Sequence, residues 1–341
     1  MGFRTYVWNI TEDRPRAPVR LVVGFFLIAI FAVIGSVVAD IFVAMLYPSI
    51  SAGYYLIATT IGLGLGAVCG TLLAAQFIDH RPVTDYGFRG AGWWRDLFVG
   101  IAVASAVLTA ALGVALAAGW VAIVDTMVAG TERFVFALVA SVALFAVVGF
   151  YEELVFRGFV LKNVAEGLAD RGAAVAVFVA VLVSSLLFGV VHLANANASL
   201  VSAAVIAVIA VTVAVSYVLT GRIGFAIGFH AAWNIAIGVL FGLPVSGVTV
   251  PGRVLAIDVS GPAVWTGGVF GLEAGMLGVL ATSTGLAAVV VYARIVHGGL
   301  RIHPDILVPT LRNTDLSIGV SSRDTETNVG AHLDTVSRSR K

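Results

Sequence analysis

Charged residues are scarce in this sequence. Asp, Glu, Lys and Arg make up only 11% of its 341 residues, against about 25% in soluble domains. Hydrophobic residues make up 60% of the chain, and the mean hydropathy is +1.02. A water-soluble core cannot absorb that much apolar surface, and a formal net charge of +1 provides no basic field for nucleic acid. The composition excludes a soluble protein and a nucleic-acid-binding protein, and it predicts an integral membrane protein.

Cysteine is nearly absent as well. With Cys69 as the only one, no intrachain disulfide and no zinc site built on several cysteines can form. A cleavable signal peptide is not expected, because the first twenty residues carry four arginines and lack a short apolar region followed by a cleavage site. We therefore expect the first hydrophobic stretch to remain as a span. No internal repeat is evident.

Long apolar stretches dominate the rest of the chain. A helix needs about 20 apolar residues to cross a bilayer core, and eight stretches approach that length: 21–47, 54–78, 97–120, 134–159, 173–192, 200–219, 224–242 and 268–292. The fold class predicted is all-α, a polytopic membrane protein with about eight transmembrane helices.

The basic residues predict how these helices are oriented. If the connections alternate between two sides, about 17 of the 20 Lys and Arg fall on the side that holds both termini. Only Arg133 and Arg253 fall on the other side, and Arg157 lies inside a span. Because cytoplasmic loops carry an excess of Lys and Arg, we expect both termini to be cytoplasmic and the protein to be a multi-pass protein of the cell membrane.

Three regions are expected along the chain. Residues 1–20 form a cytoplasmic N-terminal segment, residues 21–295 form the eight-helix membrane domain, and residues 296–341 form a cytoplasmic tail. From about residue 304 onward the sequence is rich in Ser, Thr, Asp, Asn and Arg and has no hydrophobic periodicity. We expect this tail to be flexible and to carry no chemistry.

Ionisable residues inside the apolar stretches are the strongest functional signal, because each costs about 2.5–3.5 kcal/mol to insert. Glu152, Glu153 and Arg157 lie together near the end of the fourth stretch. On a helix Glu153 and Arg157 are four residues apart and form a favourable ion pair, whereas Glu152 is rotated about 100° away. Glu152 is the carboxylate left for chemistry. The alternative is a structural ion pair with Glu152 reaching toward the interface.

Two further groups of polar residues follow. His192 ends the fifth stretch, four residues after Phe188; a histidine at such a place is often only an interfacial residue. His230 and Asn234 are four residues apart in the seventh stretch and therefore share a helix face. Hydrogen bonds between helices are the alternative role for this second pair.

Together these residues predict a hydrolytic site. Glu152, helped by His192, could take a proton from water, while His230 and Asn234 could donate hydrogen bonds to the oxyanion of a tetrahedral intermediate. No Ser or Cys lies beside a His at helical spacing as a nucleophile. A zinc ion held by Glu152, His192 and His230 is the mechanistic alternative, although the H-E-x-x-H signature is absent. We expect a reaction without a cofactor and keep zinc open.

The order of these motifs resembles the CAAX protease and bacteriocin-processing family of intramembrane glutamic proteases. The motifs are Glu-Glu-x-x-x-Arg, Phe-x-x-x-His and His-x-x-x-Asn, and all three are present without a gap between residues 150 and 240. The resemblance implies that Glu152 and His192 activate water, that Glu153 and Arg157 support Glu152, and that His230 and Asn234 stabilise the oxyanion. It also implies a membrane-associated peptide or protein substrate, prenylated in eukaryotic members, and membrane lipid as the surroundings.

One geometric conflict accompanies this prediction. A straight fifth helix beginning after Arg171 would place His192 about 30 Å from the cytoplasmic edge, while Glu152 would lie only about half as deep. Either the helices are steeply tilted, or residues 160–172 continue as helix, or the fifth span begins deeper in the membrane.

A transporter and a non-catalytic binding or immunity protein are the two alternative classes of function. Intramembrane Glu, His and Arg also build proton relays in transporters, in which Asp40 and Gln76 would be expected to matter. The lack of repeats and the gathering of the polar residues into three short motifs count against that class. The other alternative is a membrane binding or immunity protein that keeps the motifs without turnover.

Overall fold

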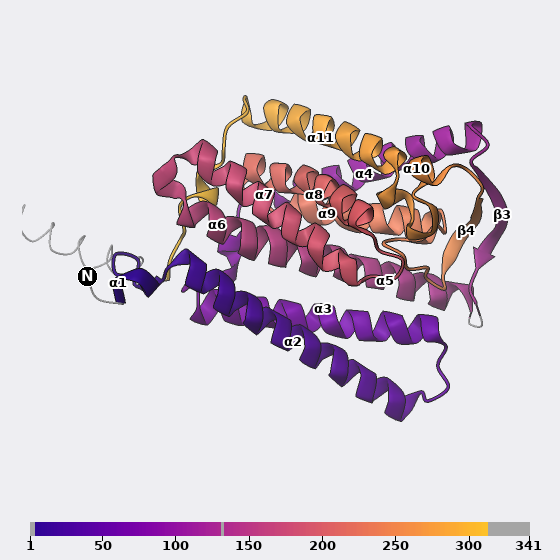
Figure 1. The fold of residues 1–341 in the computed structure, drawn as a ribbon, viewed down its shortest axis with the longest axis horizontal. Coiled ribbons are helices and arrows are strands. Elements are labelled where there is room, and N and C mark those ends of the chain that lie inside the picture. Colours follow the sequence, from indigo (N-terminus) through magenta and orange to yellow (C-terminus); the bar gives the residue numbers. More distant parts are fainter. Residues whose placement is uncertain (1–3, 131–132, 313–341) are drawn as a thin grey trace, which may run out of the picture.

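The protein is a bundle of long apolar helices that run along its longest axis (Figure 1). The computed structural model describes residues 4–130 and 133–312. The helices that form the bundle are α2 (Ala17–Leu46), α3 (Ala52–Phe77), α4 (Trp93–Ala117), α5 (Phe134–Glu153), α6 (Lys162–Gly167), α7 (Ala173–Val191), α8 (Leu200–Thr220), α9 (Gly224–Asn234) and α11 (Met276–His297).

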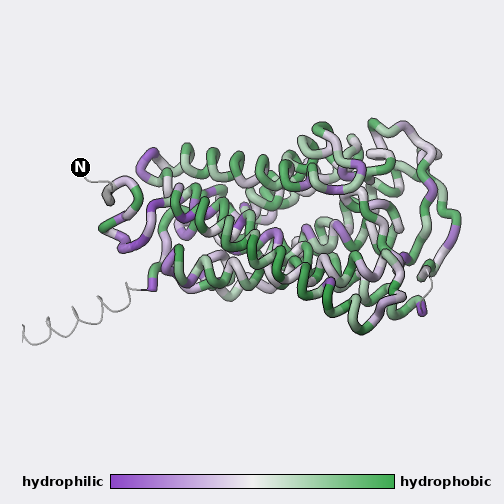
Figure 2. Tube along the Cα trace, turned by 60° about the horizontal axis from the view of Figure 1, so that its bottom comes forward, coloured by the Kyte–Doolittle hydropathy of each residue, from purple (hydrophilic) through white to green (hydrophobic). Residues whose placement is uncertain are grey.

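Within the described residues, seven helices are long and apolar enough to cross a membrane, and an eighth apolar helix, Gly224–Leu240, is shorter. The predicted all-α, polytopic fold is confirmed. Hydrophobic residues cover the helices along most of their length, as Figure 2 shows. In a bilayer this surface can face lipid, because the backbone N–H and C=O groups of each helix are hydrogen-bonded within the same helix.

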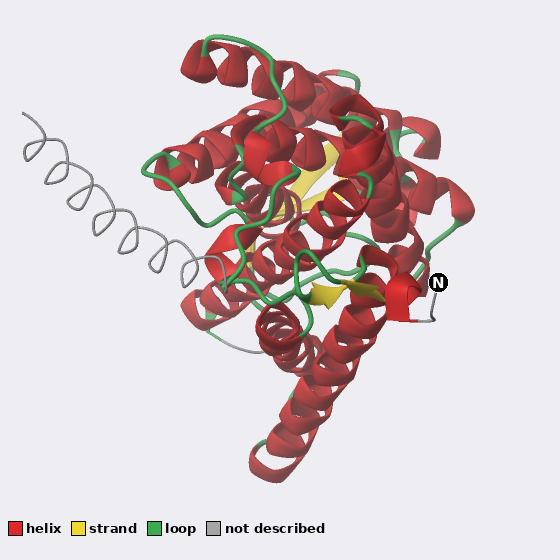
Figure 3. Cartoon of the chain, turned by 90° about the vertical axis from the view of Figure 1, so that its left-hand side faces the viewer, coloured by secondary structure: helices red, strands yellow, loops and turns green. Residues whose placement is uncertain are grey.

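Successive helices alternate in direction, so the connections gather at two ends. We call one the charged end; it comprises residues 4–16, 78–92, 168–172, 221–223 and 298–312. The other, here the strand end, comprises residues 47–51, 118–130, 192–199 and 241–275. Figure 3 looks at the charged end and shows its loops and the short β1 (Trp8–Asn9) and β2 (Arg14–Pro15) pair.

Buried ions close the charged end. The carboxylate of Glu166 contacts three arginines, at 2.6 Å for Arg81, 3.1 Å for Arg14 and 3.3 Å for Arg20, and all four side chains are at most 2% exposed. Burial by itself lowers the pKa of Arg81, but the opposing charges of Glu166 and Asp79 outweigh it and raise that pKa well above its usual value. The cluster therefore ties the N-terminal segment, the 78–92 connection and α6 together as paired charges.

At the strand end the connections form a small antiparallel sheet of β3 (Val121–Val128) and β4 (Arg253–Val259). These strands were not predicted, and the connection around residue 250 had no expected shape. β3 is apolar and follows α4 directly. In the sequence alone it therefore cannot be distinguished from a continuation of the third hydrophobic stretch. Only the pairing with β4, more than 120 residues away in sequence, identifies it as a strand.

The segment after α11 departs from the expected flexible tail. Residues 298–312 fold back along the charged end, where Ile306 is fully buried. The backbone N–H of His303 donates to Val218 O at 2.9 Å, and that of Arg312 donates to His80 O at 3.0 Å. Apolar contact and backbone hydrogen bonds thus fix a stretch whose polar composition suggested disorder. The rest of the expected tail, residues 313–341, lies outside the described residues.

The fourth span is longer than the sequence suggested, and this resolves the conflict of depth. α5 continues through a π-helical segment, η2 (Leu154–Leu161), into α6, so that one helix runs over Phe134–Gly167. Glu152 then lies roughly 22 Å from the charged end, at about 1.5 Å per residue. α7 has 19 residues, about 28 Å, so His192 and Glu152 lie at similar depth. Of the three alternatives, continuation of the helix is the one observed.

Candidate active site

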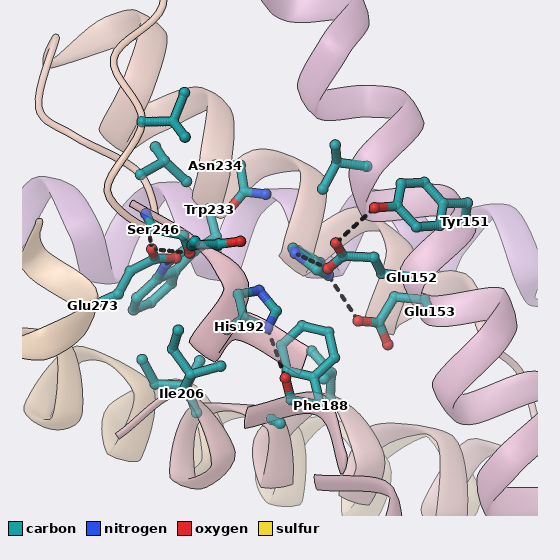
Figure 4. A pocket seen from close by; sticks show the side chains of 18 of the residues that line it. Tyr151, Glu152, Glu153, Phe188, His192, Ile206, Trp233, Asn234, Ser246 and Glu273 are labelled. Atoms are coloured by element: carbon teal, nitrogen blue, oxygen red, sulfur yellow. Dashed lines mark hydrogen bonds and ion pairs between the residues drawn. The ribbon is translucent and has the colours of Figure 1, made fainter. Parts of the chain in front are cut away.

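A cavity of about 240 Å³ lies inside the bundle, toward the strand end. Every residue predicted to take part in the site lines it: Glu152, Glu153, Arg157, Phe188, His192, His230 and Asn234. They come from α5 and η2, from α7 and the turn after it, and from α9. Figure 4 shows Glu152, His192 and Asn234 around one space, so the structure brings the three motifs together.

Glu153 and Arg157 form the ion pair that their spacing predicts. Arg157 Nη1 lies 3.0 Å from Glu153 Oε1, and both side chains are fully buried. Arg157 Nη2 also donates to the carbonyl oxygen of Ala210 on α8, at 2.9 Å, and the guanidinium lies over the Phe188 ring at 4.6 Å. The arginine therefore fixes Glu153 and links α5 to α7 and α8.

Glu152 is held differently and faces the cavity. Its Oε1 accepts a hydrogen bond from the hydroxyl of the neighbouring Tyr151 at 3.0 Å. Its Oε2 is buried and has no hydrogen-bond donor among the residues that the structure describes, although His230 Nε2 approaches it to 3.7 Å. One carboxylate oxygen is thus oriented by the protein, and the other has no hydrogen-bond donor among the described residues.

The hydrogen bond of His192 defines which of its nitrogens can accept a proton. Nδ1 lies 2.6 Å from the carbonyl oxygen of Phe188, one turn earlier on α7. A carbonyl oxygen only accepts, so Nδ1 carries the hydrogen and Nε2 of the neutral ring carries the lone pair. The rings of Phe188 and His192 are 4.6 Å apart, which further fixes the imidazole. His192 therefore offers an acceptor nitrogen at the cavity.

His230 connects the two glutamates. Its Nδ1 lies 2.8 Å from Glu153 Oε1, and its other nitrogen is the one facing Glu152. Asn234 lies one turn further along α9 and is 4% exposed, and its amide lines the same cavity. The shared helix face expected for these two residues is thus the face toward the cavity.

Two π-helical segments begin beside the site. η2 begins directly after Glu153, and η5 (Ile235–Leu240) begins directly after Asn234. A π-helical turn is wider than an α-helical one and shifts the direction of the following side chains, and such turns occur often at functional sites. η2 includes Arg157 of the first motif, whereas η5 begins after the last residue of the His230–Asn234 motif.

The zinc alternative stays open. Among residues 4–130 and 133–312, no three His, Cys, Asp or Glu side chains are grouped so as to hold one metal ion, and this includes Glu152, His192 and His230. Whether metal takes part in the reaction is a separate question, which a chelator experiment answers.

Sequence reasoning missed several polar residues that line the cavity: Thr60, Tyr151, Asn195, Ser246 and Glu273. Glu273 is 6% exposed; it accepts hydrogen bonds from Trp233 Nε1 at 3.2 Å and from the backbone N–H and hydroxyl of Ser246 at 2.6 and 2.7 Å. Figure 4 shows these contacts on the side of the cavity away from Glu152. A signal was present, because Glu273 is an acid inside a predicted span.

Asp40 and Gln76, the residues that a proton relay would be expected to use, are not among the residues lining the cavity. Asp40 accepts a hydrogen bond from Tyr55, a pair on the α2–α3 hairpin. The polar residues of the cavity and this pair are therefore separate features.

Comparison with known families gives one match. Residues 133–236 match the model of the Rce1-like family, described as type II CAAX prenyl endopeptidase Rce1-like. The matched region contains all seven motif residues, so the match confirms the resemblance to the CAAX protease family. It supports an intramembrane endopeptidase in general terms. No curated protein and no solved structure gives a match to the chain.

Proposed function

We propose that this protein is an intramembrane endopeptidase in which Glu152 and His192 activate a water molecule for attack on a peptide bond. One observation carries the proposal: the free carboxylate oxygen of Glu152, the acceptor nitrogen of His192 and the amide of Asn234 surround a single cavity within the bundle. A general base must lie within hydrogen-bond reach of the proton that it takes, and Glu152 and His192 both line the cavity in which that water would bind.

The reaction follows from the groups present. Glu152 takes one proton of the water, His192 Nε2 accepts a hydrogen bond from the other, and the hydroxide oxygen bonds to the carbonyl carbon. The carbonyl π electrons move to oxygen, and the Asn234 amide donates to that oxyanion. When the C–N bond breaks, the proton held by Glu152 passes to the leaving amine. Tyr151 keeps Glu152 oriented through both proton transfers.

The charges of the site assign a role to His230. Its Nδ1 hydrogen is donated to Glu153, so a second hydrogen on Nε2 makes the ring a cation. That cation balances Glu152, just as Arg157 balances Glu153, and buried charges are stable only when paired. His230 then presents an Nε2–H beside Asn234 for the oxyanion, and Glu153 with Arg157 position it.

Several finer features belong to the same proposal. The expected partners are membrane lipid and a membrane-associated peptide or protein, with no nucleic acid and no cofactor. We place the protein in the cell membrane with both termini in the cytoplasm, because of the distribution of Lys and Arg. A prenylated CAAX protein is one candidate substrate, and it rests on the family resemblance alone.

The test is hydrolysis by the purified, detergent-solubilised protein of a panel of quenched fluorescent peptides, prenylated CAAX peptides included. We expect E152Q to lose about 10²–10⁴-fold in kcat, D40N to match the wild type, and a chelator to have no effect. Cleavage that persists in E152Q would contradict the role of Glu152. Cleavage lost with chelator would assign the reaction to a metal, and loss in D40N alone would favour a proton relay.

A further inference from the structure

Away from the cavity, a second group of charged residues lies where α4, α9 and α11 reach the charged end. The carboxylate of Asp96, fully buried in the first turn of α4, accepts hydrogen bonds from Arg222 Nε at 2.5 Å and from the hydroxyl of Tyr292 on α11. Arg222 Nη2 adds a longer contact to the same carboxylate at 3.4 Å. Asp96 is therefore neutralised by Arg222, and the pair joins the three helices.

A second arginine joins this group without a carboxylate of its own. Arg95 Nε donates to the hydroxyl of Tyr292 at 3.1 Å and lies 4.0 Å from Asp96 Oδ1. A Cβ added at Gly92 would lie 3.0 Å from Nη2 of Arg95 and 3.0 Å from Nη2 of Arg222, so the two guanidinium groups reach the same place. Because two arginines share one carboxylate, the group carries an excess of positive charge.

Donor groups remain unused on both arginines. In the part of the chain that the structure describes, Nη1 and Nη2 of Arg95 and Nη1 of Arg222 donate to no protein group. The side chain of Arg95 is 53% exposed and that of Arg222 is 13% exposed, so a ligand outside the protein can reach them. Guanidinium groups held this close repel each other, and a phosphate that accepts hydrogen bonds from both offsets that repulsion.

The surroundings of the two arginines match a membrane interface. Arg95 lies in the first turn of α4, which begins at the charged end, and its neighbour Trp94 is exposed. Exposed tryptophans are typical of the level of the lipid headgroups. On the bilayer side of the arginines, Phe98 on α4 and Val291 on α11 are exposed apolar side chains. Positive charge therefore lies above apolar surface, as a lipid phosphate lies above its acyl chains.

We infer that Arg95 and Arg222 bind the phosphate of an anionic membrane lipid, in the leaflet that surrounds the charged end. Basic pockets between transmembrane helices recognise lipid headgroups by this chemistry. The occupant is a lipid and not a free anion, because exposed apolar side chains continue from the arginines along α4 and α11. The site is separate from the catalytic cavity, whose lining includes neither arginine.

A lipid at this site bridges two helices that pack closely together. Arg95 belongs to α4, and Arg222 precedes the first turn of α9. A Cβ added at Gly228 of α9 would come within 2.1 Å of the carbonyl oxygen of Leu97 on α4, so the two backbones are in direct contact. A phosphate shared by the two arginines holds these helices at their common end and should stabilise the folded protein.

The stabilisation is tested by thermal unfolding of the purified full-length protein in detergent, with phosphatidylglycerol, phosphatidylcholine of the same acyl chains, or inorganic phosphate added. Phosphatidylglycerol is expected to raise Tm by several degrees, and the other two to leave it nearly unchanged. R95Q keeps the Asp96–Arg222 pair, so it should fold and lose most of this shift. R171Q changes an exposed arginine at the same end of the molecule; it removes the same charge and should keep the shift.

Native mass spectrometry measures the binding itself. R95Q should bind phosphatidylglycerol about fivefold more weakly than R171Q does, which is the contribution of one arginine near an anionic headgroup. Equal binding and equal shifts in the two variants would overturn the site. A shift of the same size with phosphatidylcholine would overturn the anionic headgroup, and one with inorganic phosphate alone would overturn the lipid as the occupant. Neither measurement uses catalysis, so the result is independent of the proposed function.

Discussion

Arg157 holds the site together at the level of single residues. It neutralises Glu153, bonds the backbone of α8 and covers Phe188. Because Glu153 in turn accepts from His230, the orientation of the imidazole depends on this arginine through one carboxylate. The two adjacent glutamates are therefore held by different partners: Glu153 by Arg157 and His230, and Glu152 by the hydroxyl of Tyr151.

Replacing Arg157 with Met should destabilise the protein by about 3–5 kcal/mol, because the Glu153 charge is left buried and unpaired. Thermal unfolding in detergent measures the loss. The double variant E153Q/R157M removes both charges and should recover most of the stability while staying inactive, since His230 loses its carboxylate partner. An R157M variant as stable as the wild type would show that the Glu153–Arg157 ion pair does not stabilise the fold.

Glu273 is expected to affect substrate binding more than the chemical step. It holds the turn at Ser246 and the ring of Trp233, next to Asn234, but it does not contact Glu152 or His192 in any described interaction. In E273Q the amide group cannot accept all three hydrogen bonds, so KM should rise severalfold with a smaller change in kcat. S246A loses only the hydroxyl bond and should show a weaker effect. Unchanged KM in E273Q would contradict this role.

At the scale of elements, the meeting of α5 and α9 decides whether the motifs share one cavity. Gly149 lies against Ala231, where an added Cβ would come within 2.7 Å of the backbone nitrogen and 2.8 Å of Cα. Such contacts require the two helices to separate. The glycine thus allows the close approach that places Glu152 and Glu153 beside His230.

Substituting Gly149 with Ala should therefore lower both the thermal stability and kcat, because the helices move apart and the Glu153–His230 bond lengthens. G113A is the matched control, since a Cβ at this helical glycine meets nothing within 4 Å. It should leave kcat unchanged and stabilise the protein by about 0.5–1 kcal/mol through helix propensity. Equal behaviour of the two variants in both assays would exclude the packing argument.

Spacing along single helices was well predicted, and the elements outside them were not. The Glu153–Arg157 pair followed from four-residue spacing on one helix, a local property. The π-helical segments, the β3–β4 sheet and the packed stretch 298–312 depend on contacts between parts of the chain far apart in sequence. The Ser246 turn likewise acquires its place from Glu273, which precedes another helix.

At the scale of the whole molecule, the two ends have different tasks. The charged end is closed by the Glu166 cluster, and the strand end contributes residues that line the cavity, among them Asn195, Ser246 and Glu273. The cluster joins segments from the beginning, the first third and the middle of the chain. It therefore acts as a tertiary clamp across the end of the bundle.

Exchanging Glu166 for Gln should lower the stability by about 3–5 kcal/mol, because Arg14, Arg20 and Arg81 lose the carboxylate that they share. Unfolding in detergent measures this, and D170N, an exposed acid at the same end, is the control with no expected change. Activity per folded molecule should be retained in E166Q, since the cluster does not line the cavity. A specific loss of activity at unchanged stability would contradict the structural role.

The sequence by itself determined that the chain lies in a membrane, roughly where each helix begins and ends, and which residues are chemically unusual there. It could do so because the thickness of the bilayer sets the length of each span and the cost of burying charge marks every exception. Only the tertiary structure decided that Glu152, His192, His230 and Asn234 surround one cavity, that Tyr151 and Glu273 join them, and that this cavity lies toward the strand end. Those features depend on helix depth and on contacts between distant segments, which are fixed by packing and not by local sequence.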